Sequence, residues 1–189
     1  MQITAVILAA GSGKRIGTPK LKLKSGNEFF VNIITNNLKS EGINDIVCII
    51  RKDDLEWFKE NAAVSDYIIN DNPESGMISS VRLGVEMYKQ KGGILLFPVD
   101  HPFVTGNTIK NLMTYFGKNK DSVIKPYYKD KSGHPIIVPN SLFKYILKSN
   151  NSKSLNGIIR ESLISVVKTD IDDECILRNI NSPEDLNIQ

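Results

Sequence analysis

Strand-like and helix-like patterns of apolar residues alternate along most of this chain. Short, nearly continuous apolar runs are typical of strands buried on both faces of a sheet. They predict strands at residues 3–8, 45–50, 67–69, 94–99, 122–125, 135–138 and 165–169. Helical spacing predicts helices over residues 29–38, 55–61, 105–116, 142–147 and 155–159, and one that begins after Gly76 and ends before Gly92. The alternation favours an α/β fold, a three-layer α/β/α sandwich around a mostly parallel sheet.

Two shorter segments carry local signals. Residues 129–133 are polar and join two predicted strands, so they form either a hairpin loop or a mobile flap. Ser182, Pro183 and the acids after them have the cap, proline and charge pattern of a helix start, which predicts a short terminal helix. We find no repeat and no long linker, and 189 residues suit one domain, 1–189.

Composition narrows the classes of protein. With 41% hydrophobic and 24% charged residues, the chain resembles an ordinary water-soluble protein. Its apolar runs are strand-sized and no basic leader-like segment precedes them, so we expect a cytoplasmic protein without membrane association. The net charge of +3 and the dispersed lysines favour a small anionic ligand over nucleic acid. Cys48 and Cys175 form no Cys-x-x-Cys pair, so we expect free thiols and no structural zinc.

The first predicted strand runs directly into a glycine-rich loop with three cations. Its small residues are Ala9, Ala10, Gly11, Ser12 and Gly13, and its cations are Lys14, Arg15 and Lys20. Small residues let backbone amides approach phosphate oxygens, and the cations offset the negative charge of those oxygens. We therefore expect the loop to bind the polyphosphate of a nucleotide.

Spacing separates the kinds of phosphate-binding loop. A Walker A loop needs Ser or Thr after its lysine, but Lys14 is followed by Arg15. A dinucleotide-binding loop needs Gly-x-Gly-x-x-Gly, and Gly17 comes one residue too late, which weakens that alternative without excluding it. A nucleotidyltransferase signature, Leu-Ala-Ala-Gly-x-Gly-x-Arg and a later lysine, is filled from Leu8 to Lys20. The plain alternative is a strand-to-helix turn with solvated charges.

A carboxylate follows the predicted strand at residues 94–99. Ligands of open α/β sheets gather at the carboxyl ends of strands, and Asp100 stands there, before His101 and Pro102. Opposite a phosphate-binding loop, Asp100 would be well placed to hold Mg²⁺. The alternative is that it caps the turn.

A second junction between loop and helix lies at residues 72–84. Gly76 lets the backbone come close to a ligand, and the hydroxyls of Ser79 and Ser80 could read the polar edge of a base. A capped helix with a flexible entry is the alternative. Arg82 either contacts phosphate or is solvated.

These motifs resemble, nearly end to end, those of the MobA-like nucleotidyltransferases, above all the molybdenum cofactor cytidylyltransferases and the related molybdenum hydroxylase accessory proteins. Besides the N-terminal signature, the chain has Gly-Met-x-x-Ser-x-Arg-x-Gly from Gly76, Asp-x-Pro at Asp100, Gly-His-Pro at Gly133, His134 and Pro135, and Pro-Glu-Asp-Leu from Pro183. The resemblance implies a Rossmann-like fold of the nucleotide-diphospho-sugar transferase type.

The resemblance also implies a reaction and a set of site residues. An acceptor phosphate attacks the α-phosphorus of a nucleoside triphosphate, with CTP as donor, molybdopterin cofactor as acceptor, Mg²⁺ as metal cofactor and a molybdenum hydroxylase as partner enzyme. The implied catalytic residues are Lys14, Arg15, Lys20 and Asp100. The implied binding residues are Leu8, Ala9, Ala10, Gly11, Ser12, Gly13, Gly76 and Ser80 for nucleotide, Gly133, His134 and Pro135 for acceptor, and Asp100 and Asn181 for metal.

Some positions depart from the family pattern and keep other functions open. Asn179 and Asn181 stand where aspartates are common, so the metal has a neutral amide in place of a carboxylate. This change favours a non-catalytic accessory protein that delivers cofactor or nucleotide. Lys22 and Lys24 add positive charge beside the loop and either favour an anionic acceptor or face water. A transferase for a sugar or polyol phosphate is the nearest enzymatic alternative, and a dinucleotide-dependent oxidoreductase is a distant one.

Overall fold

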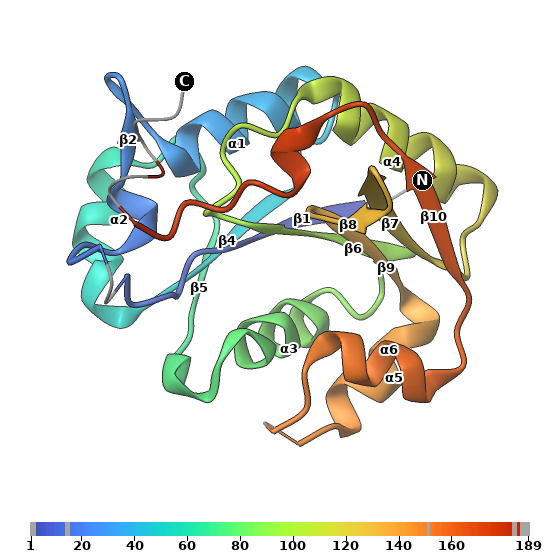
Figure 1. The fold of residues 1–189 in the computed structure, drawn as a ribbon. Coiled ribbons are helices and arrows are strands. Elements are labelled where there is room, and N and C mark those ends of the chain that lie inside the picture. The colour runs from blue at the N-terminus through green and yellow to red at the C-terminus, as the bar shows by residue number, and fades with distance from the viewer. Residues whose placement is uncertain (1–2, 14–15, 151, 183–184, 186–189) are drawn as a thin grey trace.

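The computed structural model describes residues 3–13, 16–150, 152–182 and 185. An eight-stranded sheet runs through its centre (Figure 1). Its strands are β1 (Ile3–Leu8), β4 (Ile46–Ile50), β5 (Tyr67–Ile69), β6 (Gly93–Pro98), β7 (Val123–Tyr128), β8 (Lys131–Ser132), β9 (Ile136–Pro139) and β10 (Val166–Asp170). Continuous apolar runs predicted seven of these eight strands, all except β8.

The order of strands is β10-β7-β9-β6-β1-β4-β5, with β8 paired to β7. Neighbouring strands are parallel except where β9 pairs with β6 and β7 and where β8 pairs with β7. The mostly parallel sheet is therefore confirmed. The antiparallel insertion of β9 between β6 and β7 is a feature that apolar runs do not predict, because periodicity carries no information on strand direction.

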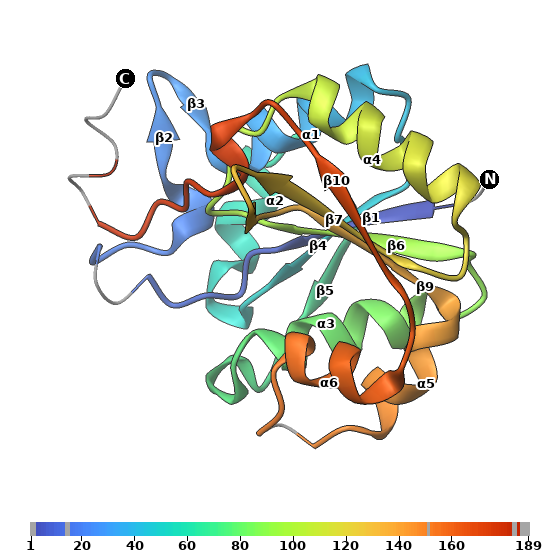
Figure 2. The same ribbon diagram turned by 45° about the vertical axis from the view of Figure 1, so that its right-hand side comes forward.

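Helices cover both faces of the sheet (Figures 1 and 2). One face carries α1 (Phe30–Ser40), α2 (Leu55–Asn61) and α4 (Gly106–Lys118), and the other carries α3 (Met77–Met87), α5 (Asn140–Lys148) and α6 (Leu155–Ser162). Side chains of β1 alternate between the two cores, with Ala5 and Ile7 on one side and Val6 and Leu8 on the other. This burial of both faces confirms the three-layer sandwich.

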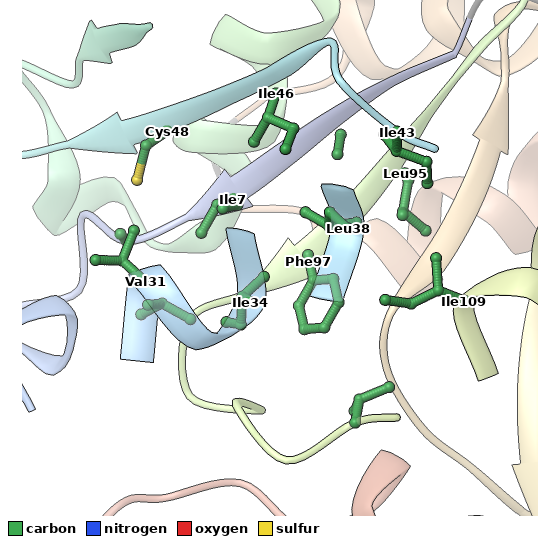
Figure 3. Packing of buried hydrophobic residues seen from close by; sticks show 14 of the residues in the cluster. Ile7, Val31, Ile34, Leu38, Ile43, Ile46, Cys48, Leu95, Phe97 and Ile109 are labelled. Atoms are coloured by element: carbon green, nitrogen blue, oxygen red, sulfur yellow. The ribbon is translucent and has the colours of Figure 1, made fainter. Parts of the chain in front are cut away.

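The core beneath α1 and α4 shows how the helical pattern meets the sheet. Ile34 and Leu38 on α1, one helical turn apart, point towards Phe97 on β6, and Ile109 of α4 lies beside them (Figure 3). All four side chains are fully buried. Burying such a side chain contributes roughly 1.5–3 kcal/mol, so the apolar spacing read from the sequence is what holds the layers together.

Two hairpins complete the fold. Within residues 129–133, Lys129 and Asp130 form the turn of a hairpin between β7 and β8, and Lys131 and Ser132 are β8 itself, which was not predicted as a strand. Lys129 and Asp130 both have positive φ values, 47° and 64°, as expected for the two central residues of a tight hairpin turn. A second hairpin, β2 (Lys24–Ser25) with β3 (Glu28–Phe29), was not predicted, because its strands are too short to show alternation.

Four short 3₁₀ turns complete the described elements: η1 (Lys20–Lys22), η2 (Lys52–Asp54), η3 (Pro73–Ser75) and η4 (Glu174–Ile176). Turns η1 and η3 each carry residues of the candidate site. Within the described residues, no helix has both the length and the apolar character needed to cross a bilayer.

Candidate functional site

The loop after β1 is shaped by its glycines. Gly13 has φ +60°, and a Cβ atom on it would lie 1.9 Å from the carbonyl oxygen of Thr18. The Gly13 carbonyl accepts hydrogen bonds from the amides of Ile16 and Gly17, both at 2.9 Å. A Cβ atom on Gly11 would meet nothing within 4 Å, so the backbone there faces open space. A ligand can therefore approach the loop closely at Gly11. The predicted cations Lys14 and Arg15 lie outside the described residues.

Three polar side chains from distant parts of the chain converge at the carboxyl ends of β1 and β6. The Lys20 Nζ atom donates to Asp100 Oδ2 and to Asn181 Oδ1, each at 2.6 Å. The side chains of Lys20 and Asp100 are each 18% exposed, so the ion pair is partly withdrawn from water. Sequence separations of 80 and 161 residues join these groups. The tertiary structure thus brings together three residues that the sequence assigned to one site.

Backbone hydrogen bonds hold the C-terminal segment against Asp100. The amide of Ile180 donates to the Asp100 carbonyl at 2.9 Å. The Asp185 carboxylate accepts from the amides of Asn181 and Ser182, both at 2.8 Å, and these bonds lower the pKa of Asp185. Asn181 is therefore fixed beside the loop. The predicted terminal helix falls largely on Pro183, Glu184 and Leu186, which lie outside the described residues.

Asp100 and Asn181 suit a hard divalent cation such as Mg²⁺. Both present side-chain oxygens, and the ammonium of Lys20 already lies between those oxygens as a positive charge. The described residues contain no cluster of three His, Cys, Asp or Glu side chains that could hold a metal. Mg²⁺ commonly keeps several waters and shares one or two protein oxygens with substrate phosphates. The donor set fits a metal held jointly with a nucleotide rather than by the protein alone.

A cavity of about 360 Å³ opens beside this cluster. Residues of the β1 loop, of η3 and of the start of α3 line it. The predicted site residues on its wall are Leu8, Ala10, Gly11, Ser12, Lys20, Gly76, Ser80 and Asp100. Ala9 is fully buried in the core under α1, and Gly13 packs on Thr18, so these two shape the loop from behind rather than line the cavity.

The entry to α3 is held by a residue that sequence reasoning missed. Asn70, 3% exposed, donates from Nδ2 to Ser79 Oγ at 2.8 Å and to Ser80 Oγ at 2.9 Å. Its Oδ1 accepts from the amide of Asn72 at 2.9 Å. Gly76 has φ 82° and ψ −179°, a conformation essentially restricted to glycine. A polar residue directly after the strand at 67–69 was the available signal for Asn70.

Two charged side chains, Arg82 and Glu74, lie near this entry. Arg82 is half-buried and does not line the cavity, and its guanidinium donates to the carbonyl oxygens of Ser149 at 2.7 Å and Ile146 at 3.5 Å, near the end of α5. Glu74, which the sequence did not single out, lines the cavity and pairs with Arg51 at 3.2 Å. A carboxylate here would accept a hydrogen bond from an amino group of a base.

A second cavity, of about 520 Å³, adjoins the first. Gly76 and Met77 line both, while Gly133 and His134 line the second alone. A Cβ atom on Gly133 would lie 2.3 Å from the Ile176 carbonyl oxygen, which also accepts from the His134 amide at 2.9 Å. The neighbouring Pro135 is buried and supports the wall from behind. The Gly-His-Pro motif therefore borders a cavity next to the Lys20 cluster.

His134 lies close to His101, with ring centroids 5.2 Å apart. Burial lowers the pKa of His134 to about 4, with a further lowering from His101 and Lys125 and an opposing effect of Asp100. Burial also lowers the pKa of His101, whose Nε2 atom lies 3.9 Å from Asp100 Oδ1. Both imidazoles are therefore neutral at neutral pH, and His134 contributes no charge to the cavity wall.

We expect His134 to make folding pH-dependent. In the unfolded chain it takes up a proton near pH 6.5, whereas in the folded protein it does so only near pH 4. Its contribution to stability is complete above about pH 6.5 and falls as the pH is lowered to 4, by about 3 kcal/mol. Urea unfolding at neutral and acidic pH should show a smaller loss for His134→Asn than for the wild type. An equal loss in both proteins would contradict this assignment.

Similarity to known proteins extends over most of the chain. The model of the MobA-like NTP transferase domain matches residues 5–166. The bifunctional protein GlmU of Clostridium botulinum strain Loch Maree is 30% identical over 140 residues, which cover 71% of this chain and 30% of GlmU. The chain thus spans less than a third of the length of this curated relative.

Solved structures share the fold over almost the whole chain. Rv0371c from Mycobacterium tuberculosis superimposes with a TM-score of 0.85 at 21% identity, over 98% of this chain and 95% of Rv0371c. Rv0371c has also been solved in complex with manganese. Molybdopterin-guanine dinucleotide biosynthesis protein A from Archaeoglobus fulgidus superimposes with a TM-score of 0.76 at 16% identity, over 97% of this chain and 95% of that one. Because the family model covers most of its residues, the chain belongs to the MobA-like NTP transferase family of nucleotidyltransferases.

Proposed function

We propose that this protein transfers CMP from CTP to the phosphate of molybdopterin cofactor and releases pyrophosphate. The observation that carries the proposal is the convergence of Lys20, Asp100 and Asn181 at the rim of a cavity lined by the glycine-rich loop. We further propose that residues 1–189 act as one cytoplasmic transferase domain. The choice of CTP and molybdopterin rests on the sequence resemblance to the cytidylyltransferase branch.

In the proposed complex, the triphosphate lies over the loop between Leu8 and Lys20. The amides near Gly11 would face its oxygens, since the backbone is open there. Lys20 would leave its partners or share them with the α-phosphate, and Lys14 and Arg15 would bind the outgoing pyrophosphate. The base would lie near Gly76 and Ser80, where Asn70 holds both neighbouring hydroxyls in place.

The proposed reaction is an in-line displacement. An oxygen of the acceptor phosphate forms a bond to the α-phosphorus, and the bond from that phosphorus to the pyrophosphate oxygen breaks. Asp100 and Asn181 would hold Mg²⁺, whose charge would be available to neutralise the phosphates. A phosphate monoester needs no catalytic base, so the chain's own residues only position the reactants and stabilise charge. The acceptor would enter through the adjoining cavity bordered by Gly133 and His134.

A direct assay tests the proposal. The protein with Mg²⁺ is incubated with each of CTP, GTP, ATP and UTP, with molybdopterin or with sugar and polyol phosphates, and pyrophosphate release is measured. We expect release only when CTP and molybdopterin are both present. Pyrophosphate release with GTP would show that the enzyme prefers guanine to cytosine. Release with a sugar phosphate would show that the acceptor is a sugar phosphate and not molybdopterin.

One observation favours a second candidate, a non-catalytic protein that binds nucleotide or cofactor for a molybdenum hydroxylase. Asn181 offers the metal a neutral amide, and Lys20 already occupies the space between the two oxygen donors. Weak metal binding would impair chemistry more than ligand binding. Tight CTP binding without any pyrophosphate release in the presence of Mg²⁺ would support this second candidate.

A further inference from the structure

The second cavity contains a lysine that neither the motifs nor the proposed chemistry use. Lys125 lies on β7, between the buried residues Ile124 and Pro126, and its side chain lines the cavity beside His134. The hydrogen-bond partner of its Nζ atom is a neutral one, Asn156 Oδ1 at 2.6 Å. In the part of the chain that the structure describes, no carboxylate lies within 4 Å of this ammonium.

A half-buried ammonium without a counter-charge is costly. Burial lowers the pKa of Lys125, whose positive charge lowers the pKa of His134, and both side chains line the same cavity. A buried cation normally has an anionic partner, and where the protein supplies none, a ligand is the natural source of the missing charge.

The rest of the cavity wall fits an anion. Among the described residues, no Asp or Glu lines it. Its polar groups include Ser132, Ser154 and Asn156, and Lys153 adds a second cation, although Lys153 is paired with Glu161 at 2.5 Å. Apolar side chains of Ile78, Ile136 and Leu155 complete the wall, so the cavity suits an organic body with a charged end.

Strand register separates Lys125 from the Lys20 cluster. Ile124 pairs with Ile137, which sets Lys125 beside Ile136, and Ile136 pairs with Leu96 on β6. Asp100 is four residues further along the chain from Leu96. Two strand spacings separate the Cα atoms of Lys125 and Leu96 by about 10 Å, and Asp100 lies in the turn beyond the end of β6. Lys125 and the Lys20 cluster therefore approach the two cavities from different strands of the sheet.

We propose that Lys125 binds a second anionic group of the acceptor, at the end opposite the phosphate that attacks the nucleotide. The inference rests on the proposed function, because it describes the acceptor of that reaction. The acceptor class is an elongated organic molecule that carries an anionic group at each end, with an apolar or aromatic body between them. Asn156 orients the ammonium of Lys125 and so acts as a positioning residue.

A binding experiment tests this inference without turnover. Octanediol bisphosphate carries a phosphate at each end of an apolar chain, whereas octyl phosphate carries only one. Isothermal titration calorimetry should show that the wild type binds the bisphosphate about tenfold more tightly than octyl phosphate. In Lys125→Met this preference should disappear while the affinity for octyl phosphate changes less than about twofold.

Lys168→Met is the matched control. Lys168 is the Cα partner of Lys125 on β10, and it is exposed and outside the cavity wall. This variant has the same change of charge and should keep the preference for the bisphosphate. Absence of the preference in the wild type, its persistence in Lys125→Met, or an equal loss for both ligands would overturn the inference.

A second measurement covers the case in which Lys125→Met folds poorly. In wild-type protein with ¹³C-dimethylated lysines, the Lys125 resonance should shift on addition of octanediol bisphosphate and not of octyl phosphate. A resonance that ignores both ligands would also refute the inference. If the wild type released no pyrophosphate from CTP and molybdopterin, the proposed reaction would be refuted instead. Failure of the inference and failure of the proposed function are therefore distinguishable.

Discussion

Replacing Lys20 by methionine is expected to lower the rate of pyrophosphate release by about one hundredfold to one thousandfold. Lys20 Nζ contacts both Asp100 and Asn181 at 2.6 Å, at the point where the α-phosphate is proposed to react. Losing one such preorganised contact to a developing negative charge typically costs about 3 kcal/mol of barrier. Steady-state turnover with CTP and acceptor measures the effect. The fall should appear in kcat more than in the KM for CTP, because the contact is strongest in the transition state.

Lys24→Met provides the matched control for this experiment. Lys24 is an exposed lysine of the β2–β3 hairpin, and its Nζ atom lies 4.3 Å from the centre of the Phe29 ring. Its replacement removes the same charge near the same loop but should leave turnover unchanged. Equal losses in both variants would mean that the general positive field of the loop matters and that Lys20 has no specific role.

Replacing Asp100 by asparagine is expected to weaken divalent metal binding at least about tenfold and turnover about a thousandfold. Asp100 provides the one carboxylate of the two proposed metal ligands, and it forms an ion pair with Lys20. Mn²⁺ is a suitable probe, and its binding can be titrated by electron paramagnetic resonance with CTP present. Unchanged Mn²⁺ affinity would remove Asp100 from the metal site.

Asn181→Asp is the complementary variant to Asp100→Asn. It places a carboxylate where the amide oxygen of Asn181 now accepts from Lys20. We expect Mn²⁺ affinity to increase about tenfold, because an anionic oxygen replaces a neutral one. Increased affinity together with increased turnover would favour an enzyme with a weakened metal site. If Mn²⁺ affinity increases in Asn181→Asp but the wild type shows no turnover, the non-catalytic accessory protein is favoured.

The local order of elements could be read from the chain before its structure was known. Buried strands such as β1 and β6 are continuous apolar runs, and α1 and α4 carry their apolar residues one helical turn apart. These patterns arise because each element must bury a defined face, so they are written into short stretches of sequence. The glycine-rich loop could also be predicted from the sequence, because the positive φ of Gly13 depends on the residue type at that one position.

The sequence did not predict the direction of short strands or the hydrogen-bond partners of single side chains. The β9 strand (Ile136–Pro139) was expected as a strand, but only its pairing with β6 and β7 shows that it runs antiparallel. The role of Asn70 was also hidden, because its partners Ser79 and Ser80 belong to the next helix. Each depends on contacts that form only when distant segments pack.

The sequence by itself determined the sandwich and predicted the glycine-rich loop, because both depend on residue type and local spacing. Only the tertiary structure decided that Lys20, Asp100 and Asn181 meet, and that Lys125 faces a cavity whose described lining residues include no carboxylate. Hydrogen bonds of 2.6 Å across 80 and 161 residues of sequence require the complete sheet and the return of the C-terminal segment to Asp100. The physical reason is that a site is a product of packing, while its component side chains are already present in the unfolded chain.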